Sequence, residues 1–179
     1  MQTPASFKAR LNVDIRTNTE ITAIDRAAKT VTAKDLKSGK EYSEKYDKLV
    51  LSPGAEPVRP PLPGIDDPAI FTLRSVPDTD RIKEYLEEHR VRHAVVVGAG
   101  FIGVEMAENL HHRGIMVSIV EMAPQVMTYL DFELAAQVHQ HLKAKNVGLY
   151  LGEAVKAFER DSAGLKVEFP TDDGIVTAV

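Results

Sequence analysis

The chain has 179 residues, of which 44% are hydrophobic and 27% charged, with a formal net charge of −4 and no cysteine. This balance predicts a soluble globular protein of one domain, or of one domain and part of another, and excludes disulfide scaffolds, cysteine-bound metals and thiol catalysis by this chain. The acidic charge without a dense basic run argues against nucleic acid or a membrane surface as a partner, and no spanning segment or secretory signal is found, so we expect a cytoplasmic protein.

The first third of the chain, residues 11–52, predicts short strands joined by polar turns. Apolar and polar residues alternate in several runs, and the turn-forming segment 37–40 lies between two of them, as in a hairpin. Residues 48–51, Lys-Leu-Val-Leu, form a short apolar run, which fits a buried strand. The segments expected to form strands are residues 13–15, 21–24, 30–33, 41–43 and 48–51.

A proline-rich segment follows these strands. Six prolines lie between residues 53 and 68, and glycines occupy positions 54 and 64. Because proline has no backbone N–H to donate, this segment predicts an extended connector. We place a domain boundary near its end, between residues 1–74 and 75–179.

From about residue 78 the pattern alternates between helix and strand. Apolar residues recur at helical spacing in three segments, and short apolar runs lie between these segments. Such alternation predicts an α/β fold with a parallel sheet and helical crossovers. The expected helices are residues 78–89 with Asp78 or Thr79 as N-cap, 101–112, and 132–145 capped by Asp131, and the expected strands are residues 94–97, 116–120 and 147–151.

The end of the chain has a different pattern. Residues 154–159 and 165–169 alternate apolar and polar side chains around the turn-forming segment 161–164, which predicts an antiparallel hairpin. Residues 175–179 predict the beginning of a further strand. An antiparallel group of strands is therefore expected beside the parallel sheet.

A glycine-rich motif lies between the first strand and the first helix of the parallel sheet. It reads Gly98-Ala99-Gly100-Phe101-Ile102-Gly103, the GxGxxG pattern of dinucleotide-binding folds. Gly98 would form the tight turn, Gly100 would let a pyrophosphate approach the backbone, and Gly103 would let the helix pack closely on the strand. The helix N-terminus offers free N–H groups to the phosphates, so the motif predicts a dinucleotide site.

An acidic residue ends the next predicted strand. Glu121 lies 23 residues after Gly98, close to the spacing of about 20 at which a carboxylate binds the adenosine ribose. Residues 121–131, which begin with Glu121 and Met122, contain no Lys or Arg that would bind a 2′-phosphate. The sequence therefore predicts NADH in preference to NADPH.

Other polar side chains either leave two interpretations open or argue against a site. Glu105, on the helix after the motif, could accept a hydrogen bond from a nicotinamide carboxamide, or could be a negative charge favourably placed near a helix N-terminus. His139 and His141, two residues apart on a helix, point to different faces and predict no shared metal. Ser52 lacks the surroundings of a hydrolase nucleophile.

Two motifs in this order resemble those of the pyridine nucleotide-disulfide oxidoreductases. The first runs from Tyr46 to Ala55 and includes Ser52-Pro53-Gly54-Ala55, and the second runs from Val96 to Glu105 and includes the glycine motif. The Ser-Pro-Gly-Ala form of the first motif is similar to that of coenzyme A-disulfide reductases and of related NADH oxidases and persulfide reductases. The resemblance covers nearly the whole chain and implies an FAD-dependent enzyme.

The resemblance also implies a division of the chain and roles for single residues. Residues 1–74 would be the C-terminal part of an interrupted FAD-binding domain, and residues 75–179 a Rossmann-like NAD(H)-binding domain with a parallel sheet and an antiparallel β-meander. Phe101 matches a position that often carries a flavin-covering tyrosine, and Glu105 matches a carboxylate near the nicotinamide. The expected cofactor-binding residues are Gly98, Gly100, Phe101, Ile102, Gly103, Glu105, Glu121, Met122, Ser52, Pro53, Gly54 and Ala55.

Some features of the family are not found in this sequence. The family begins with a glycine-rich FAD loop and a redox-active cysteine, and ends with a strand that returns to the FAD domain and a dimerisation domain. We therefore expect an internal fragment, inactive alone, of a homodimeric enzyme that transfers hydride from NADH to FAD and on to a disulfide, coenzyme A disulfide, a persulfide or oxygen. A flavin-dependent ferredoxin reductase component and a non-catalytic NADH-binding module remain alternatives.

Overall fold

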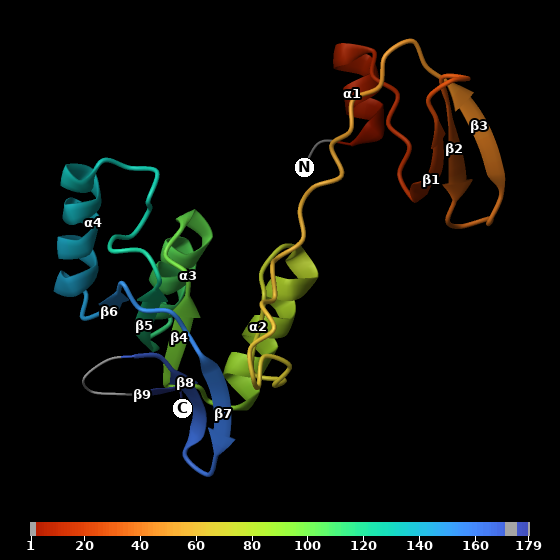
Figure 1. Cartoon of the computed structure of the whole chain (residues 1–179). Helices are drawn as coiled ribbons and strands as arrows, with labels where there is room; N and C mark the ends of the chain where they lie inside the picture. The colour runs from red at the N-terminus through yellow and green to blue at the C-terminus, as the bar shows by residue number, and fades with distance from the viewer. Residues whose placement is uncertain (1–2, 171–174, 179) are drawn as a thin grey trace. The chain divides into compact units, whose positions relative to one another are not determined.

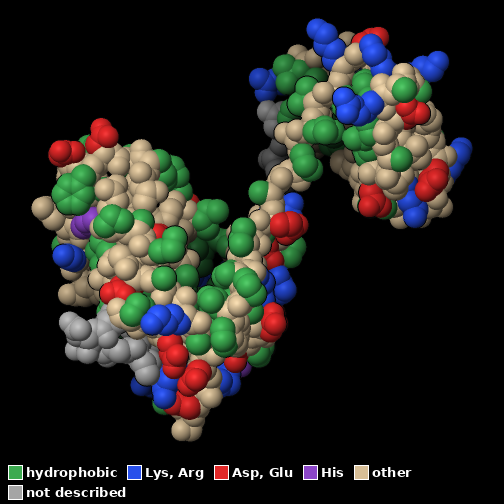
Figure 2. Space-filling view, in the orientation of Figure 1, with side chains coloured by type: hydrophobic (Ala, Val, Ile, Leu, Met, Phe, Trp, Pro, Cys, Tyr) green, Lys and Arg blue, Asp and Glu red, His purple; other side chains and the backbone are tan. Residues whose placement is uncertain are grey.

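The computed structural model describes residues 3–170 and 175–178. The chain forms two compact units, Met1–Gly54 and Ala55–Val179 (Figure 1). Side chains of both signs lie on each unit in the view of Figure 2, which agrees with the mixed charge of the sequence. Within the described residues, no helix is long and apolar enough to cross a membrane.

The described residues of the first unit form one helix and a three-stranded antiparallel sheet. Helix α1 (Pro4–Leu11) begins after Thr3, whose hydroxyl accepts the Ser6 N–H, and was not expected from the sequence. The sheet has the order β1-β2-β3, which confirms the predicted hairpin around residues 37–40. Its strands are β1 (Thr19–Asp25), β2 (Thr30–Asp35) and β3 (Glu41–Lys45).

Two strands expected in the first unit are absent from its described residues. Residues 13–15 are irregular and lie between the left-handed cap of α1, Asn12, and the start of β1 at Thr19. Residues 48–51 are irregular and exposed, and the Val50 side chain is 86% exposed. A strand needs a partner for its backbone hydrogen bonds, and the sheet of this unit ends at β3. The prediction of a buried strand there was wrong for this structure.

The second unit contains the predicted parallel sheet. Its strand order is β4-β5-β6, and helices α3 and α4 form the crossovers, packing against β4, β5 and β6. Ile119, Val126 and Ala107 are fully buried in the core between helices and sheet. The α/β prediction is confirmed. The elements are β4 (His93–Val97), α3 (Phe101–His112), β5 (Met116–Glu121), α4 (Phe132–Ala144) and β6 (Gly148–Leu151).

The helix before the sheet begins earlier than the sequence predicted. Helix α2 (Val76–Glu88) has Ser75 as its N-cap, and Asp78 is the third helical residue. The Asp78 carboxylate accepts the Ser75 N–H at 2.8 Å, which is the carboxylate half of a capping box, and it also accepts the Ser75 hydroxyl at 2.7 Å. The expected cap at Asp78 or Thr79 was wrong, because the acidic residue closes the box from inside the helix.

An antiparallel meander completes the second unit. Strands β7 (Ala157–Asp161), β8 (Gly164–Glu168) and β9 (Ile175–Ala178) pair in that order, which confirms the predicted hairpin and following strand. Val179, the last residue of that predicted strand, lies outside the described residues. Phe158 and Val167 are buried in a second cluster that also includes Val120 of β5, so the meander packs on the parallel sheet.

The proline-rich connector belongs to the second unit. The Phe158 N–H donates to the Pro63 carbonyl at 2.8 Å, and Gly64 lies so close to β7 that a Cβ there would be 2.0 Å from the Phe158 carbonyl oxygen. Asp67 forms a two-bond ion pair with Arg160. The compact units divide after Gly54, so Pro53 and Gly54 lie in the first unit and the rest of the connector lies in the second. The expected division at residue 74 refers to cofactor-binding domains and stays a prediction.

Candidate functional site

The glycine motif forms a tight turn between β4 and α3. Gly98 has φ of +99°, a conformation that side chains with a Cβ rarely adopt, and its N–H donates to the Val120 carbonyl of β5 at 2.8 Å. Gly100 follows as the N-cap of α3. The turn therefore directs the N-terminus of α3 towards the carboxyl end of the parallel sheet, where open α/β sheets bind their ligands.

The other two motif glycines differ in their surroundings. A Cβ on Gly103 would lie 2.0 Å from the Gly98 carbonyl oxygen and 3.4 Å from Val96, so a side chain there would collide with the turn. A Cβ on Gly100 would have no described atom within 4 Å. Gly103 thus allows close packing of helix on turn, as predicted, whereas Gly100 leaves backbone open to an approaching group.

Within the described residues, no side chain caps the N-terminus of α3. An α-helix leaves its first N–H groups without intrahelical acceptors, and α3 has neither a side-chain cap nor an acidic residue in its first turn. By contrast, α2 carries Asp78 and α4 carries Glu133 in that position. The positive end of the α3 dipole is therefore available for an external anion such as a phosphate.

Glu121 is fixed at the end of β5 by backbone donors. One carboxylate oxygen accepts the Ala99 N–H at 2.7 Å, and the other accepts the Ala123 N–H at 2.8 Å. Ala99 is the second residue of the glycine motif, so this carboxylate also holds the turn. A carboxylate has about four acceptor positions, and two remain for the hydroxyls of a ribose. The sequence predicted the ribose-binding role of Glu121 but not its hydrogen bonds to the glycine turn and to Ala123.

Several apolar side chains around the turn are exposed. Phe101 is 60% exposed and stacks on Tyr129, with ring centroids 4.5 Å apart. Ile102 and Met122 are also exposed, and so is the carboxylate-bearing side chain of Glu105 in the second turn of α3. This end of the parallel sheet thus offers apolar surface, free backbone N–H groups and carboxylates together.

Known proteins share this combination of turn, helix and sheet. The family model described as pyridine nucleotide-disulphide oxidoreductase matches residues 4–179. The chain belongs to this family. Its sequence is 39% identical to an NADH oxidase of Methanocaldococcus jannaschii over 175 residues, which is 97% of this chain and 38% of that protein.

Solved structures of family members are similar over nearly the whole chain. Reduced CoADR-RHD of Bacillus anthracis has 47% identity and a TM-score of 0.84, over 99% of this chain and 32% of that one. The water-forming NADH oxidase of Lactobacillus brevis, bound to NADH, has 30% identity and a TM-score of 0.81, over 99% and 39%. The chain spans about two fifths or less of these proteins, so it corresponds to a part of a family member.

The structure brings the sequence-predicted residues of the second unit together around one turn. Gly98, Gly100 and Gly103 surround one turn, and Glu121 reaches this turn through its bond to Ala99. Phe101, Ile102 and Glu105 lie on the first turns of α3, and Met122 follows Glu121. Ser52, Pro53 and Gly54 belong to the first unit and Ala55 begins the second, in an exposed irregular segment.

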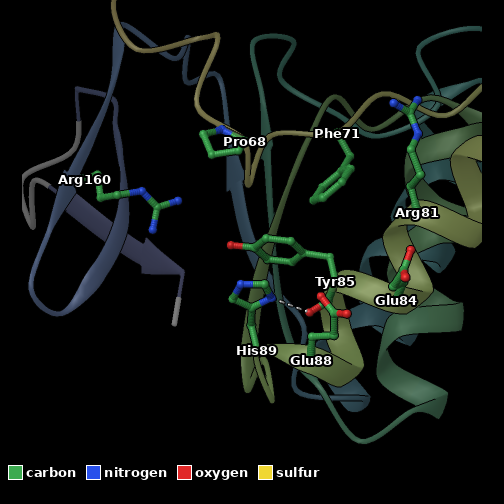
Figure 3. A pocket seen from close by; sticks show the side chains of 8 residues that line it. All are labelled: Pro68, Phe71, Arg81, Glu84, Tyr85, Glu88, His89 and Arg160. Carbon is green, nitrogen blue, oxygen red and sulfur yellow. Dashed lines mark hydrogen bonds between the residues drawn. The ribbon is translucent and has the colours of Figure 1, made fainter.

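A surface groove in the second unit lies at other residues. It has a volume of about 450 Å³, and Figure 3 shows Tyr85 over His89, with Phe71 and Arg160 beside them. The two rings of Tyr85 and His89 stack with centroids 4.0 Å apart. Both guanidinium groups of the groove are paired, Arg81 with Asp78 and Arg160 with Asp67. None of the expected cofactor-binding residues lines it, so it does not compete with the turn as a phosphate site.

Proposed function

We propose that the second unit binds NADH through the glycine turn, the N-terminus of α3 and Glu121, as part of an FAD-dependent oxidoreductase. The observation that carries the proposal is the N-terminus of α3, which begins at the N-cap Gly100, is capped by no described side chain and has open space in front of the Gly100 backbone. The geometry fits a pyrophosphate, because anions bind at such helix ends. Relatives that include an NADH oxidase and an NADH-bound structure support the choice of ligand.

Each residue of the site would have a distinct task. The first N–H groups of α3 would donate to phosphate oxygens, and the free acceptor positions of Glu121 would receive ribose hydroxyls while Ala99 and Ala123 hold the carboxylate. Phe101, Ile102 and Met122 would offer apolar contact. Glu105 would accept from the nicotinamide carboxamide. When bound, NADH supplies a hydride that a flavin accepts.

We further infer the role of the whole protein from the family. It would transfer hydride from NADH to FAD and on to a disulfide, coenzyme A disulfide, a persulfide or oxygen, with residues 1–74 as part of the FAD-binding domain. Ser52, Pro53, Gly54 and Ala55 would pass close to the flavin. Because this chain has no cysteine, a thiol acceptor would come from residues beyond these 179, and the isolated chain would be inactive. We expect the whole enzyme to be a cytoplasmic homodimer.

Calorimetric titration of the chain with NADH tests the proposal. We expect binding at one site, and we expect Gly100→Val to abolish it without loss of helix content, because the added side chain fills the open space and meets no protein atom near its Cβ. Ala144→Val, at an exposed position in the last turn of α4, is a matched control that should bind as the parent does. Equal NADH binding by Gly100→Val and the parent would refute the site.

A further inference from the structure

The segment between β5 and α4, residues 122–131, is held in place by a histidine. Val126 lies at the middle of this segment, is fully buried in the main core cluster, and donates its backbone N–H to Nε2 of His139 at 3.1 Å. His139 belongs to α4 and is half-buried. A ring nitrogen accepts a hydrogen bond only when it carries no proton, so this contact requires the neutral imidazole with its proton on Nδ1.

The residue after Val126 connects the segment to the glycine turn. Met127 adopts a left-handed conformation, with φ of +47°, and donates its N–H to the Ala99 carbonyl at 2.8 Å. Ala99 is 1% exposed, and its own N–H donates to Glu121. The two backbone polar groups of Ala99 are thus bound to Glu121, the last residue of β5, and to Met127 in the segment that follows it. A movement of the Val126 backbone would therefore reach the glycine turn through the next residue, Met127, and its hydrogen bond to Ala99.

The surroundings of His139 favour its neutral form. Burial lowers the pKa of His139 from its ordinary value, and the positive charge of Lys143, one turn further along α4, lowers it further. The Phe132 ring, edge-on to the imidazole at 6.4 Å between centroids, carries no charge. Strand β6 packs on α4 and contains one titratable side chain, Tyr150, which packs against Phe169 in the other cluster. Within the described residues, Lys143 is the charged group that acts on this histidine.

We propose that His139 is a positioning residue for the dinucleotide site, and that its protonation weakens NADH binding by releasing Val126 and thereby the glycine turn. This inference rests on the proposed function. A protonated imidazole would present an N–H to the Val126 N–H, so the segment would have to move. Because the binding form is unprotonated, affinity should be full above the ordinary pKa of histidine and should fall as the pH drops through the lower pKa of His139 in the folded chain.

The test is an affinity profile between about pH 8 and about pH 5, with ADP-ribose as the probe because NADH decomposes in acid. We expect the affinity of the parent to fall about tenfold over this range, as for one lost hydrogen bond. His139→Gln places an uncharged acceptor near the position of Nε2, so its affinity at about pH 5 should equal its own affinity at about pH 8. His141→Gln, at an exposed position of the same helix, should follow the parent.

The same samples separate this inference from the proposed function. Failure of the parent to bind NADH at about pH 8 would refute the proposed function, whereas the histidine contact would still be read from the amide NMR signals of Val126, Met127 and Ala99 in the free chain. These signals should titrate together in the parent and in His141→Gln but not in His139→Gln. The inference would be overturned if the affinity of His139→Gln fell with pH as that of the parent does, or if the amide signals did not titrate with His139.

Discussion

The contrast between Gly103 and Gly100 gives the most detailed prediction. Alanine at position 103 would bring a Cβ to 2.0 Å from the Gly98 carbonyl oxygen, where ordinary contacts begin at 3.4 Å. The turn and α3 would have to separate by more than one ångström, and overpacking of this kind costs about 1–3 kcal/mol in stability. Alanine at position 100 meets no described atom within 4 Å and should cost little stability.

The assay for this pair is thermal unfolding by circular dichroism, combined with titration of each variant with NADH. We expect Gly103→Ala to unfold about 5 °C below the parent and to bind NADH more weakly, because the turn is displaced. We expect Gly100→Ala to unfold at the same temperature as the parent. Its affinity for NADH should be lower by about tenfold or more, because its methyl group points into the open space. If Gly103→Ala were as stable as the parent, or Gly100→Ala lost as much stability as Gly103→Ala, the reasoning would be refuted.

Four further predictions concern charges and cofactors. Glu121→Gln turns an amide N–H towards the Ala99 or Ala123 N–H, so we expect stability to fall by about 1–2 kcal/mol in urea unfolding and NADH to bind more weakly. The parent should bind NADH more tightly than NADPH by on the order of 30- to 1000-fold, and Glu121→Ala combined with Met122→Arg should shift this preference towards NADPH. Equal dissociation constants of the parent for the two cofactors would contradict the role of Glu121. Arg160 lowers the pKa of Asp67, so this pair stabilises the fold above the ordinary carboxyl pKa and the effect is lost as pH falls through the lower folded value. Asp67→Asn should lower the free energy of unfolding by on the order of 1 kcal/mol at neutral pH, a small value because the guanidinium is partly exposed. In acid, the variant and the parent should be equally stable. The purified chain should be colourless and without NADH-dependent disulfide reductase activity, and stoichiometric flavin absorbance would contradict this.

The parallel sheet and its helices were predictable because local signals agree with the fold. The apolar run at residues 94–97, the glycine motif and the apolar stripe of α3 each specify the same strand-turn-helix unit, and α3 occupies the predicted residues 101–112. Glu121 ends β5 as expected from its spacing. Signals that depend on one element alone, such as the glycines of the turn, carried over directly into the structure.

Features that depend on a distant partner were not predictable. The run at residues 48–51 is apolar enough for a buried strand, yet a strand forms only where a neighbouring strand supplies hydrogen bonds. The sheet of the first unit consists of β1, β2 and β3 and does not pair with this run. The bond of Val126 to His139 joins residues 13 apart whose types carry no motif. Ser and Asp are both common N-caps, so the sequence alone did not decide between Ser75 and Asp78 as the start of α2.

Amide NMR of the 15N-labelled chain during titration with NADH tests the central claim most directly. Binding at the proposed site should shift the signals of residues 98–104 and of Ala123, whose N–H donates to Glu121, and should leave those of Tyr85 and His89 in the separate groove unchanged. Unchanged signals at the glycine turn, with shifts confined to Tyr85 and His89, would contradict the account.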